Sequence, residues 1–394
     1  MLKQTWKTTS YPSNYKKRTI CTKVNILFSI FLIFGFIVLY LQYYHVDNSI
    51  KTIISNVPSL KVTGSNRTVT FSNVYTNISK ELVIVVQVHN RDMYLTHLID
   101  SLRNAAGIET VLLIFSHDYY DEKLNKLIAK IDFCSYKQIY YPYSVQNHTN
   151  SFPGPETNTD KNGKRPNRNA TTAQIKHHWW WKANVVFNAL SVQKYQGLVL
   201  LLEEDFYVLE DFIFSLKQMQ IAANKFCNNC KILSLADNPD ATNIGRAKIT
   251  NANQVRITKK FSNMGIALNI KTWNEIVNCA DSFCKYNDDN WDFSLQNVIS
   301  TCLEDTDTMM LMFPRVVHIG ACGVHVTSKN CDSTETILKI KDKFKEVKSL
   351  LFPRSLEKHS RNPYPVYSRP NGGWEDVRDH QLCRNMTTST AKEL

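Results

Sequence analysis

Short apolar runs alternate with apolar positions at helical spacing through the middle of the chain, and this pattern predicts strands followed by helices. Leu82–His89 (LVIVVQVH) is the first expected buried strand, and leucine and isoleucine then recur at helical spacing until Gly107 ends the helix. Val111–Ser116 is the second expected strand, followed by a helix over Leu124–Ile131. Strand, helix, strand, helix in this order is typical of a parallel α/β sheet.

One apolar stretch, Leu198–Leu202, is followed directly by the acids Glu203, Glu204 and Asp205. So short a run, entered through Gly197, fits a strand buried on both faces, and its carboxyl end opens where α/β proteins bind ligands. Clustered carboxylates repel one another unless a cation lies between them, so a divalent metal is one interpretation. A solvated acidic turn that caps the next helix is the other.

A polar segment over Asn147–Thr172 predicts a long surface loop, and a helix containing KHHWWWKANVVFNAL is expected after it. Three adjacent tryptophans cannot all point inward from one helix, so at least one is expected to pack at a groove or against a loop. Further elements are a helix that starts near Leu209, strands at Lys231–Leu235 and Met309–Phe313, and a helix after Asn290–Asp292.

The apolar residues Ile26–Leu41 carry no charge and, with the residues after them, are long enough to cross a bilayer. Lysines and an arginine precede them and would hold the N-terminus in the cytoplasm. A cleaved signal peptide is the competing interpretation, but the long basic segment and the absence of a small-residue cleavage site count against it. We therefore expect a cytoplasmic tail (1–23), a signal anchor (24–44), a stem (45–80) and a luminal domain (81–394).

Two further features agree with a luminal domain. Nine of the ten cysteines follow the expected anchor, as in compartments where disulfides persist. Sequons for N-glycosylation, which act only in the secretory pathway, begin at Asn66, Asn77, Asn147, Asn169 and Asn385.

The chain has 394 residues, enough for one large α/β domain or two smaller ones, and a net charge of +12. No basic helix or nucleic-acid module accompanies the charge, so we expect no nucleic-acid partner. Attraction of anionic substrates and a solvated basic surface explain the charge equally well.

Several motifs carry candidate chemistry. Gln87–Arg91 lies where the first strand meets the first helix, which suits a nucleotide's base or phosphate, although a capped turn with a surface arginine is the simpler interpretation. Ser116–Asp118 would face the same crevice. His177 and His178 are able to bind metal, but neighbours on a helix point in different directions.

Later in the chain, His318 follows an expected strand, either as a core histidine or as a nitrogen ligand of Mn²⁺. Asp292, between two aromatic residues at a helix start, is a candidate general base. Cys227 and Cys230 fit a redox pair, half of a zinc site or a short disulfide, and the oxidising compartment favours the disulfide.

Together these motifs resemble the Golgi N-acetylglucosaminyltransferase II family. The matching stretches occur in the same order between Leu82 and Cys383, so the resemblance spans nearly the whole luminal domain. They are VVQVHNR, GIETVLLIFSHD, KHHWWWK, LEED, NMGIAL, NWD, PRVVHIGACG and NGGWEDVRDHQLC.

The resemblance implies an α/β GT-A fold, a Rossmann-like nucleotide half joined to an acceptor half. It also implies a type II Golgi membrane enzyme that uses UDP-GlcNAc and Mn²⁺ to extend the α1,6-arm mannose of N-glycans. Asp205 and His318 would hold the metal, and Asp292 would be the catalytic base. The donor site would be lined by Gln87, Val88, His89, Asn90, Arg91, Asp118, Gln174, Ile175, Lys176, His177 and His178.

The family's cysteine pairing would leave Cys134 free, with Cys21 in the cytoplasm. The implied disulfides are Cys227–Cys230, Cys279–Cys302, Cys284–Cys383 and Cys322–Cys331. Two departures stand out: the loop before HHWWW is shorter and lacks a cysteine pair, and Thr242 stands near the place of an arginine that contacts the donor, with Arg246 a few residues on.

A second hypothesis is a type II membrane lectin that binds glycans through a metal without chemistry. It predicts a Cys-rich module without a nucleotide site, against which the α/β pattern and Gln87–Arg91 argue. The same fold with another UDP-sugar donor is a third hypothesis.

Overall fold

The computed structural model describes residues 80–154, 168–237, 242–322, 332–359 and 369–388. All of them belong to one compact unit, Phe71–Leu394. The expected cytoplasmic tail, signal anchor and all but the last residue of the stem lie outside these ranges. Among the described residues, no helix combines the length and apolar character that a membrane crossing requires.

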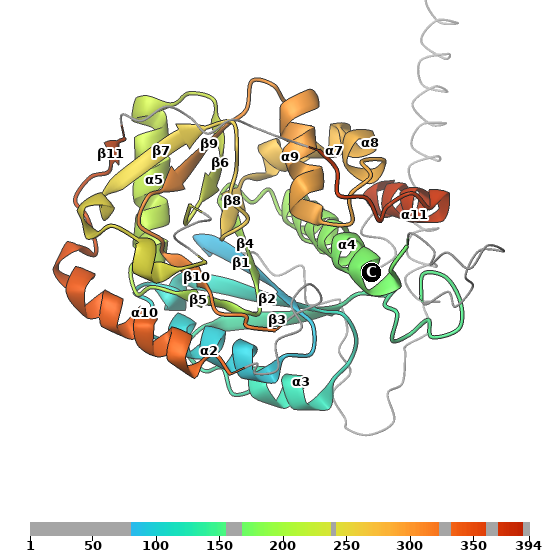
Figure 1. Cartoon of the computed structure of the whole chain (residues 1–394), viewed down its shortest axis with the longest axis horizontal. Helices are drawn as coiled ribbons and strands as arrows, with labels where there is room; N and C mark the ends of the chain where they lie inside the picture. The colour runs from blue at the N-terminus through green and yellow to red at the C-terminus, as the bar shows by residue number, and fades with distance from the viewer. Residues whose placement is uncertain (1–79, 155–167, 238–241, 323–331, 360–368, 389–394) are drawn as a thin grey trace, which may run out of the picture. The chain divides into compact units, whose positions relative to one another are not determined.

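A mixed sheet lies at the centre of the described chain (Figure 1). Its strands are β1 (Leu82–Val88), β2 (Val111–His117), β3 (Ser135–Tyr140), β4 (Leu198–Glu203), β6 (Cys230–Ser234), β7 (Gln254–Thr258), β8 (Ile266–Leu268), β9 (Asp307–Leu311) and β11 (Glu357–Lys358). Their order across the sheet is β11-β7-β9-β6-β8-β4-β1-β2-β3. The parallel arrangement expected at the start is confirmed, since β4, β1, β2 and β3 pair in parallel. β8 then runs antiparallel between β4 and β6, so the whole sheet is mixed.

The chain reverses its direction of travel across the sheet next to β1. It passes from β1 to β2 to β3 and then returns to place β4 on the other side of β1. This point, where the strand order switches, is where open α/β sheets bind ligands, outside the carboxyl ends of the strands. The register aligns Gln87 with both Ser116 and Glu203, so three polar side chains end neighbouring strands together.

Helices cover both faces of the sheet. One core cluster joins the even-numbered side chains of β1 to α2 (Asp92–Arg103), α3 (Glu122–Ile128) and α5 (Phe212–Phe226). The opposite cluster joins Val83 and Val85 of β1 to α4 (Ala170–Val192), α7 (Ile270–Asn278), α8 (Ala280–Cys284), α9 (Trp291–Thr301) and α11 (Val377–Thr388). β1 is therefore apolar on both faces because both faces are covered.

A smaller layer closes one end of the sheet. β5 (Phe206–Val208) pairs with β10 (Val316–His318) in an antiparallel ribbon, which places His318 opposite Phe206. α10 (Thr334–Val347) contributes Ile337 and Ile340 to the third core cluster beside it. This ribbon carries His318 to the carboxyl end of β4.

Several element boundaries differ from the prediction, among them those of the first helix and of α4. The first helix ends at Arg103 rather than at Gly107, and Gly107 adopts φ 85° before a short 3₁₀ turn, Ile108–Thr110. A glycine favours this left-handed backbone because it lacks a Cβ atom. The loop expected to reach Thr172 ends earlier, since α4 begins at Ala170.

The prediction that at least one tryptophan of the HHWWW motif packs at a groove or against a loop is confirmed by Trp181, which packs edge-on against Tyr141 in the loop after β3, with ring centroids 5.5 Å apart. The premise that the three indoles cannot all be buried is wrong. Trp179, Trp180 and Trp181 are only 1%, 0% and 4% exposed. α4 is enclosed on more than one side, because the sheet covers one face while α7, α9 and α11 pack against the others. Trp179 stacks on Trp291 of α9 with ring centroids 4.4 Å apart.

Three of the implied disulfides are present: Cys227–Cys230, Cys279–Cys302 and Cys284–Cys383. Cys322 is also disulfide-bonded, and Cys331, its implied partner, lies outside the described residues. Cys134 is free and half-buried, as the resemblance implies.

Candidate active site

Two of the three acids that follow the apolar part of β4 share the partner Arg91, and the first has a different one. Glu203 accepts a hydrogen bond from the indole N–H of Trp291 at 3.1 Å. Glu204 is fully buried and Asp205 is 4% exposed. The interpretation as a solvated capping turn is therefore wrong, since two of the acids are buried and α5 begins only at Phe212.

Arg91 is the cation that lies between these acids. Its Nε donates to Glu204 Oε1 at 2.6 Å, and its Nη1 donates to Asp205 Oδ2 at 2.8 Å. The second oxygen of Glu204 accepts from the backbone N–H of His89 at 2.8 Å. Glu204 therefore ties the strand-to-helix turn Gln87–Arg91 to the end of β4.

Asp205 and His318 meet at one edge of this cluster. His318 Nε2 lies 3.2 Å from Asp205 Oδ2, and the carboxylate, by charge and hydrogen bond, outweighs burial and raises the pKa of His318. The pKa of Asp205 is lowered, because the hydrogen bond with His318 and the charge of Arg91 outweigh the effect of burial. The other oxygen, Asp205 Oδ1, is buried without a hydrogen-bond partner.

The backbone beside this pair leaves room for a ligand. At Gly320, an added Cβ would lie 2.5 Å from Asp205 Oδ2 and 3.0 Å from His318 Nε2. A carboxylate oxygen and an imidazole nitrogen are ligands that Mn²⁺ accepts. The orphaned Oδ1 and the space kept by Gly320 fit a cation at the pair expected from the sequence.

Asp292 lies in the first turn of α9, directly after Trp291, whose indole binds Glu203. Its pKa is raised to about 6, first because its surroundings desolvate the carboxyl group and then because of the charges of Glu203 and Asp288. Asn263 donates to Asp292 Oδ2 at 3.3 Å, and the backbone N–H of Phe293 donates to Oδ1 at 2.9 Å. A carboxylate with a pKa near neutrality suits general-base catalysis.

Glu203 acts on both Asp292 and the Asp205–His318 pair through its charge. Its charge raises the pKa of Asp292 and also contributes to the raised pKa of His318. Since Glu203 accepts from Trp291, the residue before Asp292, and ends β4 two residues before Asp205, Asp292 and the Asp205–His318 pair both lie beside the carboxyl end of β4. Their placement in separate regions of the molecule would have contradicted the sequence interpretation.

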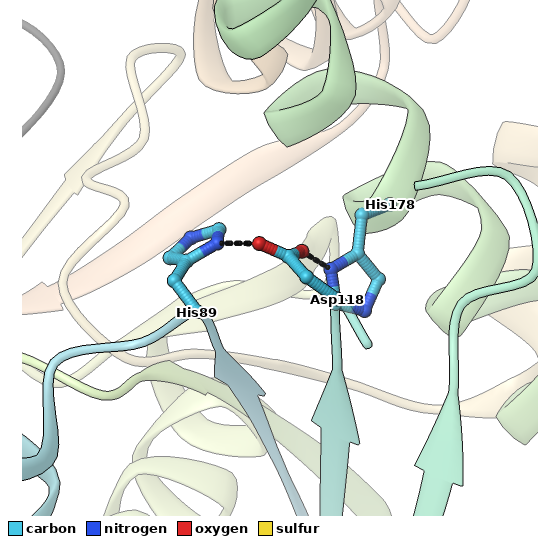
Figure 2. Close-up of side chains that lie close together, drawn as sticks. All are labelled: His89, Asp118 and His178. Carbon is cyan, nitrogen blue, oxygen red and sulfur yellow. Dashed lines mark hydrogen bonds and ion pairs between the residues drawn. The ribbon is translucent and has the colours of Figure 1, made fainter. Parts of the chain in front are cut away.

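Figure 2 shows a second polar cluster, in which Asp118 lies between two histidines. His89 Nδ1 and His178 Nδ1 each lie 2.6 Å from one of its oxygens. Burial favours neutral His89, but the charge and hydrogen bond of Asp118 outweigh it and raise the pKa of His89 to about 9. Burial lowers the pKa of His178 to about 4, and its Nε2 lies 2.7 Å from the hydroxyl of Ser116.

These three residues are also close enough together to hold a metal ion. Each Nδ1 already has a carboxylate oxygen at hydrogen-bond distance, so a charged His89 and a neutral His178 satisfy Asp118 without an ion. We therefore interpret the cluster as a set of side chains that hold one another by hydrogen bonds beside the ends of β1 and β2.

Other residues expected to line the donor site reach the crevice to different extents. Gln87 Nε2 donates to the carbonyl of Ile175 at 3.4 Å, which links β1 to α4. Gln174 Oε1 accepts from the backbone of Val145 at 2.5 Å. Val88 is buried in the core and contributes its carbonyl to Asp118 N, and Asn90 is exposed.

Lys176 and His177 point away from the His89–Asp118–His178 cluster. Lys176 donates to the carbonyl of Asp288 at 2.8 Å and lies 3.9 Å above the ring of Trp374. His177 Nε2 lies 2.9 Å from Asp379 Oδ1 in α11. In the described structure these two side chains hold the C-terminal segment against α4.

The sequence interpretation gave no role to Asn263, Arg168 or Asp379. Asn263 lies in the motif NMGIAL, but nothing in that stretch indicates a contact with Asp292. Arg168 binds Asp379 at 2.6 Å although 211 residues separate them. Thr242, which stands near the place of an expected donor-binding arginine, is exposed. Arg246 is also exposed and ends the 3₁₀ turn Ile244–Arg246.

Comparison with known proteins agrees with the resemblance seen in the motifs. A sequence model of the family described as N-acetylglucosaminyltransferase II (MGAT2) matches residues 59–383. The alpha-1,6-mannosyl-glycoprotein 2-beta-N-acetylglucosaminyltransferase of Mus musculus is 37% identical over 329 residues, 77% of this chain and 74% of the relative. The protein of the same name from Homo sapiens is 37% identical over 330 residues, 78% and 73% of the two chains.

A more distant relative with that name, from Arabidopsis thaliana, is 29% identical over 343 residues, 80% of this chain and 77% of the relative. Among solved structures, S. aureus TarS 1-349 in complex with UDP-GlcNAc matches with a TM-score of 0.36 and 11% identity. That match covers 70% of this chain and 68% of TarS 1-349, and a likeness this low carries no conclusion.

Proposed function

The chain belongs to the N-acetylglucosaminyltransferase II family, and from this premise we propose that it transfers GlcNAc from UDP-GlcNAc in β1,2 linkage to the α1,6-arm mannose of N-glycans. The observation that carries the proposal is the arrangement at the end of β4, where Glu203 accepts from Trp291, the residue before Asp292, and Asp205, two residues after Glu203, lies 3.2 Å from His318. A candidate base, whose pKa is raised to about 6, and a candidate cation site would therefore lie together at the point where the sheet order switches.

The nucleotide of the donor would bind across the ends of β1 and β2. Gln87–Arg91 supplies a strand-to-helix turn there, and the His89–Asp118–His178 cluster supplies fixed donors and acceptors. Arg91, already placed by Glu204 and Asp205, lies where a diphosphate would meet a positive charge. The arrangement corresponds to the nucleotide half of a GT-A fold.

Asp205 and His318 would hold Mn²⁺. When bound, a divalent cation stabilises negative charge that develops on a departing diphosphate. Arg91 donates to Asp205 Oδ2, the oxygen that also lies 3.2 Å from His318 Nε2. The unpartnered Oδ1 is therefore the Asp205 atom available to the ion.

Asp292 is placed to act on the acceptor. Its carboxylate takes the proton from the mannose 2-hydroxyl as that oxygen attacks C1 of the donor sugar. Asn263 and the backbone N–H of Phe293 hold the carboxylate in place. The donor linkage is α and the product linkage is β, so one displacement inverts the configuration and no covalent sugar–enzyme intermediate is needed.

The location of the enzyme is also part of the proposal. Residues 24–44 would anchor a single-pass type II protein in the Golgi membrane, with residues 81–394 in the lumen. The apolar run Ile26–Leu41, the basic residues before it and the disulfides of the folded chain support this arrangement.

Incubation of the purified full chain with UDP-GlcNAc, Mn²⁺ and a glycan that bears GlcNAc on its α1,3 arm tests the proposal. We expect one GlcNAc to be added to the α1,6-arm mannose. Asp292→Asn should still be retained on UDP-agarose but transfer about 10²–10⁴-fold more slowly. Asp205→Ala should lose the Mn²⁺-dependent part of UDP retention, whereas the exposed control Asp305→Asn should change neither.

The alternatives give different results in the same experiment. A lectin would bind the glycan without retention on UDP-agarose and without transfer. A transferase with another donor would be retained on UDP-agarose but would act only with a different member of a UDP-sugar panel. Near-normal transfer by Asp292→Asn would remove that residue from the role of base.

A further inference from the structure

The start of α4 coincides with a sequon, Asn169-Ala170-Thr171. Asn169 and Thr171 are exposed, whereas the next two residues, Thr172 and Ala173, are buried. A glycan acceptor needs a side chain at the surface, and the structure provides one immediately before the helix enters the core.

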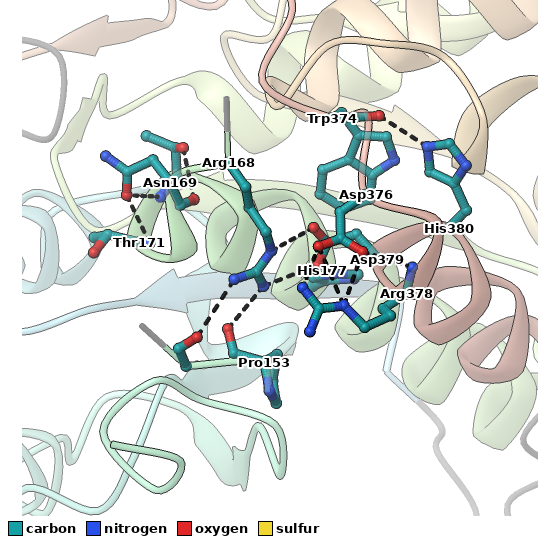
Figure 3. Close-up of polar contacts among 12 residues, drawn as sticks. Pro153, Arg168, Asn169, Thr171, His177, Trp374, Asp376, Arg378, Asp379 and His380 are labelled. Atoms are coloured by element: carbon teal, nitrogen blue, oxygen red, sulfur yellow. Dashed lines mark hydrogen bonds and ion pairs between the residues drawn. The ribbon is translucent and has the colours of Figure 1, made fainter. Parts of the chain in front are cut away.

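The side chain of Asn169 has a structural task that uses only its oxygen. Oδ1 accepts from the backbone N–H of Thr171 at 2.9 Å and from that of Thr172 at 3.4 Å, which caps the N-terminus of α4. In Figure 3 the amide oxygen faces this first turn and the amide nitrogen faces away from it. An N-linked glycan is attached to the nitrogen, so glycan and cap use different atoms of one amide.

The backbone on either side of the sequon is firmly held. Arg168 binds Asp379 of α11 through two nitrogens and donates to the carbonyl of Pro153 at 2.8 Å (Figure 3). Asp379 also binds His177, about two helical turns into α4. A glycan at Asn169 would therefore project from a fixed point and would not need the helix start to open.

We propose that Asn169 carries an N-linked glycan and still caps α4. In the attachment step, Asn169 Nδ2 forms a bond to the anomeric carbon of an oligosaccharide carried on a lipid diphosphate. The bond from that carbon to the diphosphate breaks, and the amide loses one proton to solvent. The three disulfides of the described chain agree with the compartment in which this modification takes place.

The sequon at Asn385 offers a contrast within the same structure. The hydroxyl of its Thr387 accepts a hydrogen bond from the indole of Trp180 at 2.8 Å, and Met386 is 2% exposed. Asn385 is itself exposed, but the two residues after it take part in the contact between α11 and α4, whereas Thr171 of the Asn169 sequon is exposed.

The full chain, expressed in a eukaryotic secretory cell and extracted from membranes, tests the proposal. After removal of N-glycans by an amidase in ¹⁸O-water, mass spectrometry should find the Asn169 peptide converted to the labelled aspartate. Asn169→Asp and Thr171→Ala should each lose one glycan step on a gel, and both should keep the wild-type melting temperature because both keep a capping oxygen. Asn169→Ala should lose the same step and also melt earlier.

An Asn169 peptide recovered without the label would overturn the proposal, whether or not other sequons are occupied. Equal melting temperatures for Asn169→Ala and Asn169→Asp would overturn the capping half. The inference does not depend on the proposed reaction, because glycan occupancy is measured separately from GlcNAc transfer on the same preparation.

Discussion

At the scale of single residues, the acidity of Asp292 is the property most open to measurement. Burial of its carboxyl group and the charge of Glu203 both disfavour the ionised form, and together with Asp288 they raise its pKa to about 6. A general base must be ionised to accept a proton, so the reaction should weaken as the pH falls through that value. At pH values above the pKa of Asp292, the carboxylate is ionised and the rate should no longer depend on its protonation.

Glu203→Gln should shift this pH dependence in a known direction. Removal of a nearby negative charge makes ionisation of Asp292 easier, so the acid limb of kcat/KM should move to lower pH. Glu304→Gln, an exposed change, should leave the limb where it is. A limb that stays in place in Glu203→Gln, or moves to higher pH, would contradict the electrostatic link between the two carboxyl groups.

Sequence reasoning named candidate site residues but not the side chains that they contact. Asp205, Asp292 and His318 were identified from acids at a strand end, an acid at a helix start and the resemblance. The hydrogen bond from Arg91 to Glu204 was not predicted, because 113 residues separate the two and no local sequence pattern indicates such a contact. Side-chain partners of this kind depend on the register of distant strands.

At the scale of elements, a buried ion pair holds the β5–β10 ribbon against α5. Arg315, directly before β10, and Asp211, directly before α5, are both fully buried, with Arg315 Nε 2.8 Å from Asp211 Oδ1. Asp211 also accepts from Ser215 and from the backbone of Phe352. The ribbon in turn positions His318.

Arg315→Met should destabilise the fold by about 3–5 kcal/mol, because it leaves a buried carboxylate without its charged partner. The change is measured by thermal or urea unfolding. Adding Asp211→Asn should recover part of the loss, since it removes the uncompensated charge. Lys217→Met breaks an exposed pair with Glu81 and should cost less than about 1 kcal/mol; a similar loss in both variants would contradict this account.

The disulfide Cys284–Cys383 ties α11 to α8 across a sequence separation of 99 residues. Replacing both cysteines with alanine should lower the free energy of unfolding by about 2–5 kcal/mol, because closure of a long loop restricts the unfolded chain. The matched control is the Cys227–Cys230 pair, with a separation of 3 residues. Its removal should cost less, and the reverse order would show that loop length does not set the effect.

The periodic elements of the first half of the chain were predicted, whereas the later helices α7, α10 and α11 and several short strands were missed. β8 and β10 have three residues each, too few for a period to show, and both depend on neighbours distant in sequence. The burial of all three tryptophans on α4 was missed for a related reason. A single helix pattern cannot reveal that other helices, placed much later in the chain, enclose it.

At the scale of the whole molecule, the proposed orientation in the membrane makes a prediction about the two ends of the chain. The full chain inserted into microsomes should keep residues 81–394 protected from added protease, while a tag on the N-terminus is removed. After detergent is added, the protease should digest residues 81–394 as well as the N-terminal tag. Protection of the N-terminal tag with digestion of the C-terminal part would reverse the proposed topology, and release into the lumen after cleavage would favour a signal peptide.

The three acids at the end of β4 have a consequence for how this enzyme can change. Glu203, the last residue of β4, meets Trp291, while Glu204 and Asp205, in the turn that follows, both meet Arg91. Single replacements alter one neighbour at a time. Inserting or deleting one residue between Leu202 and Glu203 would instead move all three carboxylates away from these partners at once, so the spacing of this short stretch is more tightly constrained than the identity of any one of its residues.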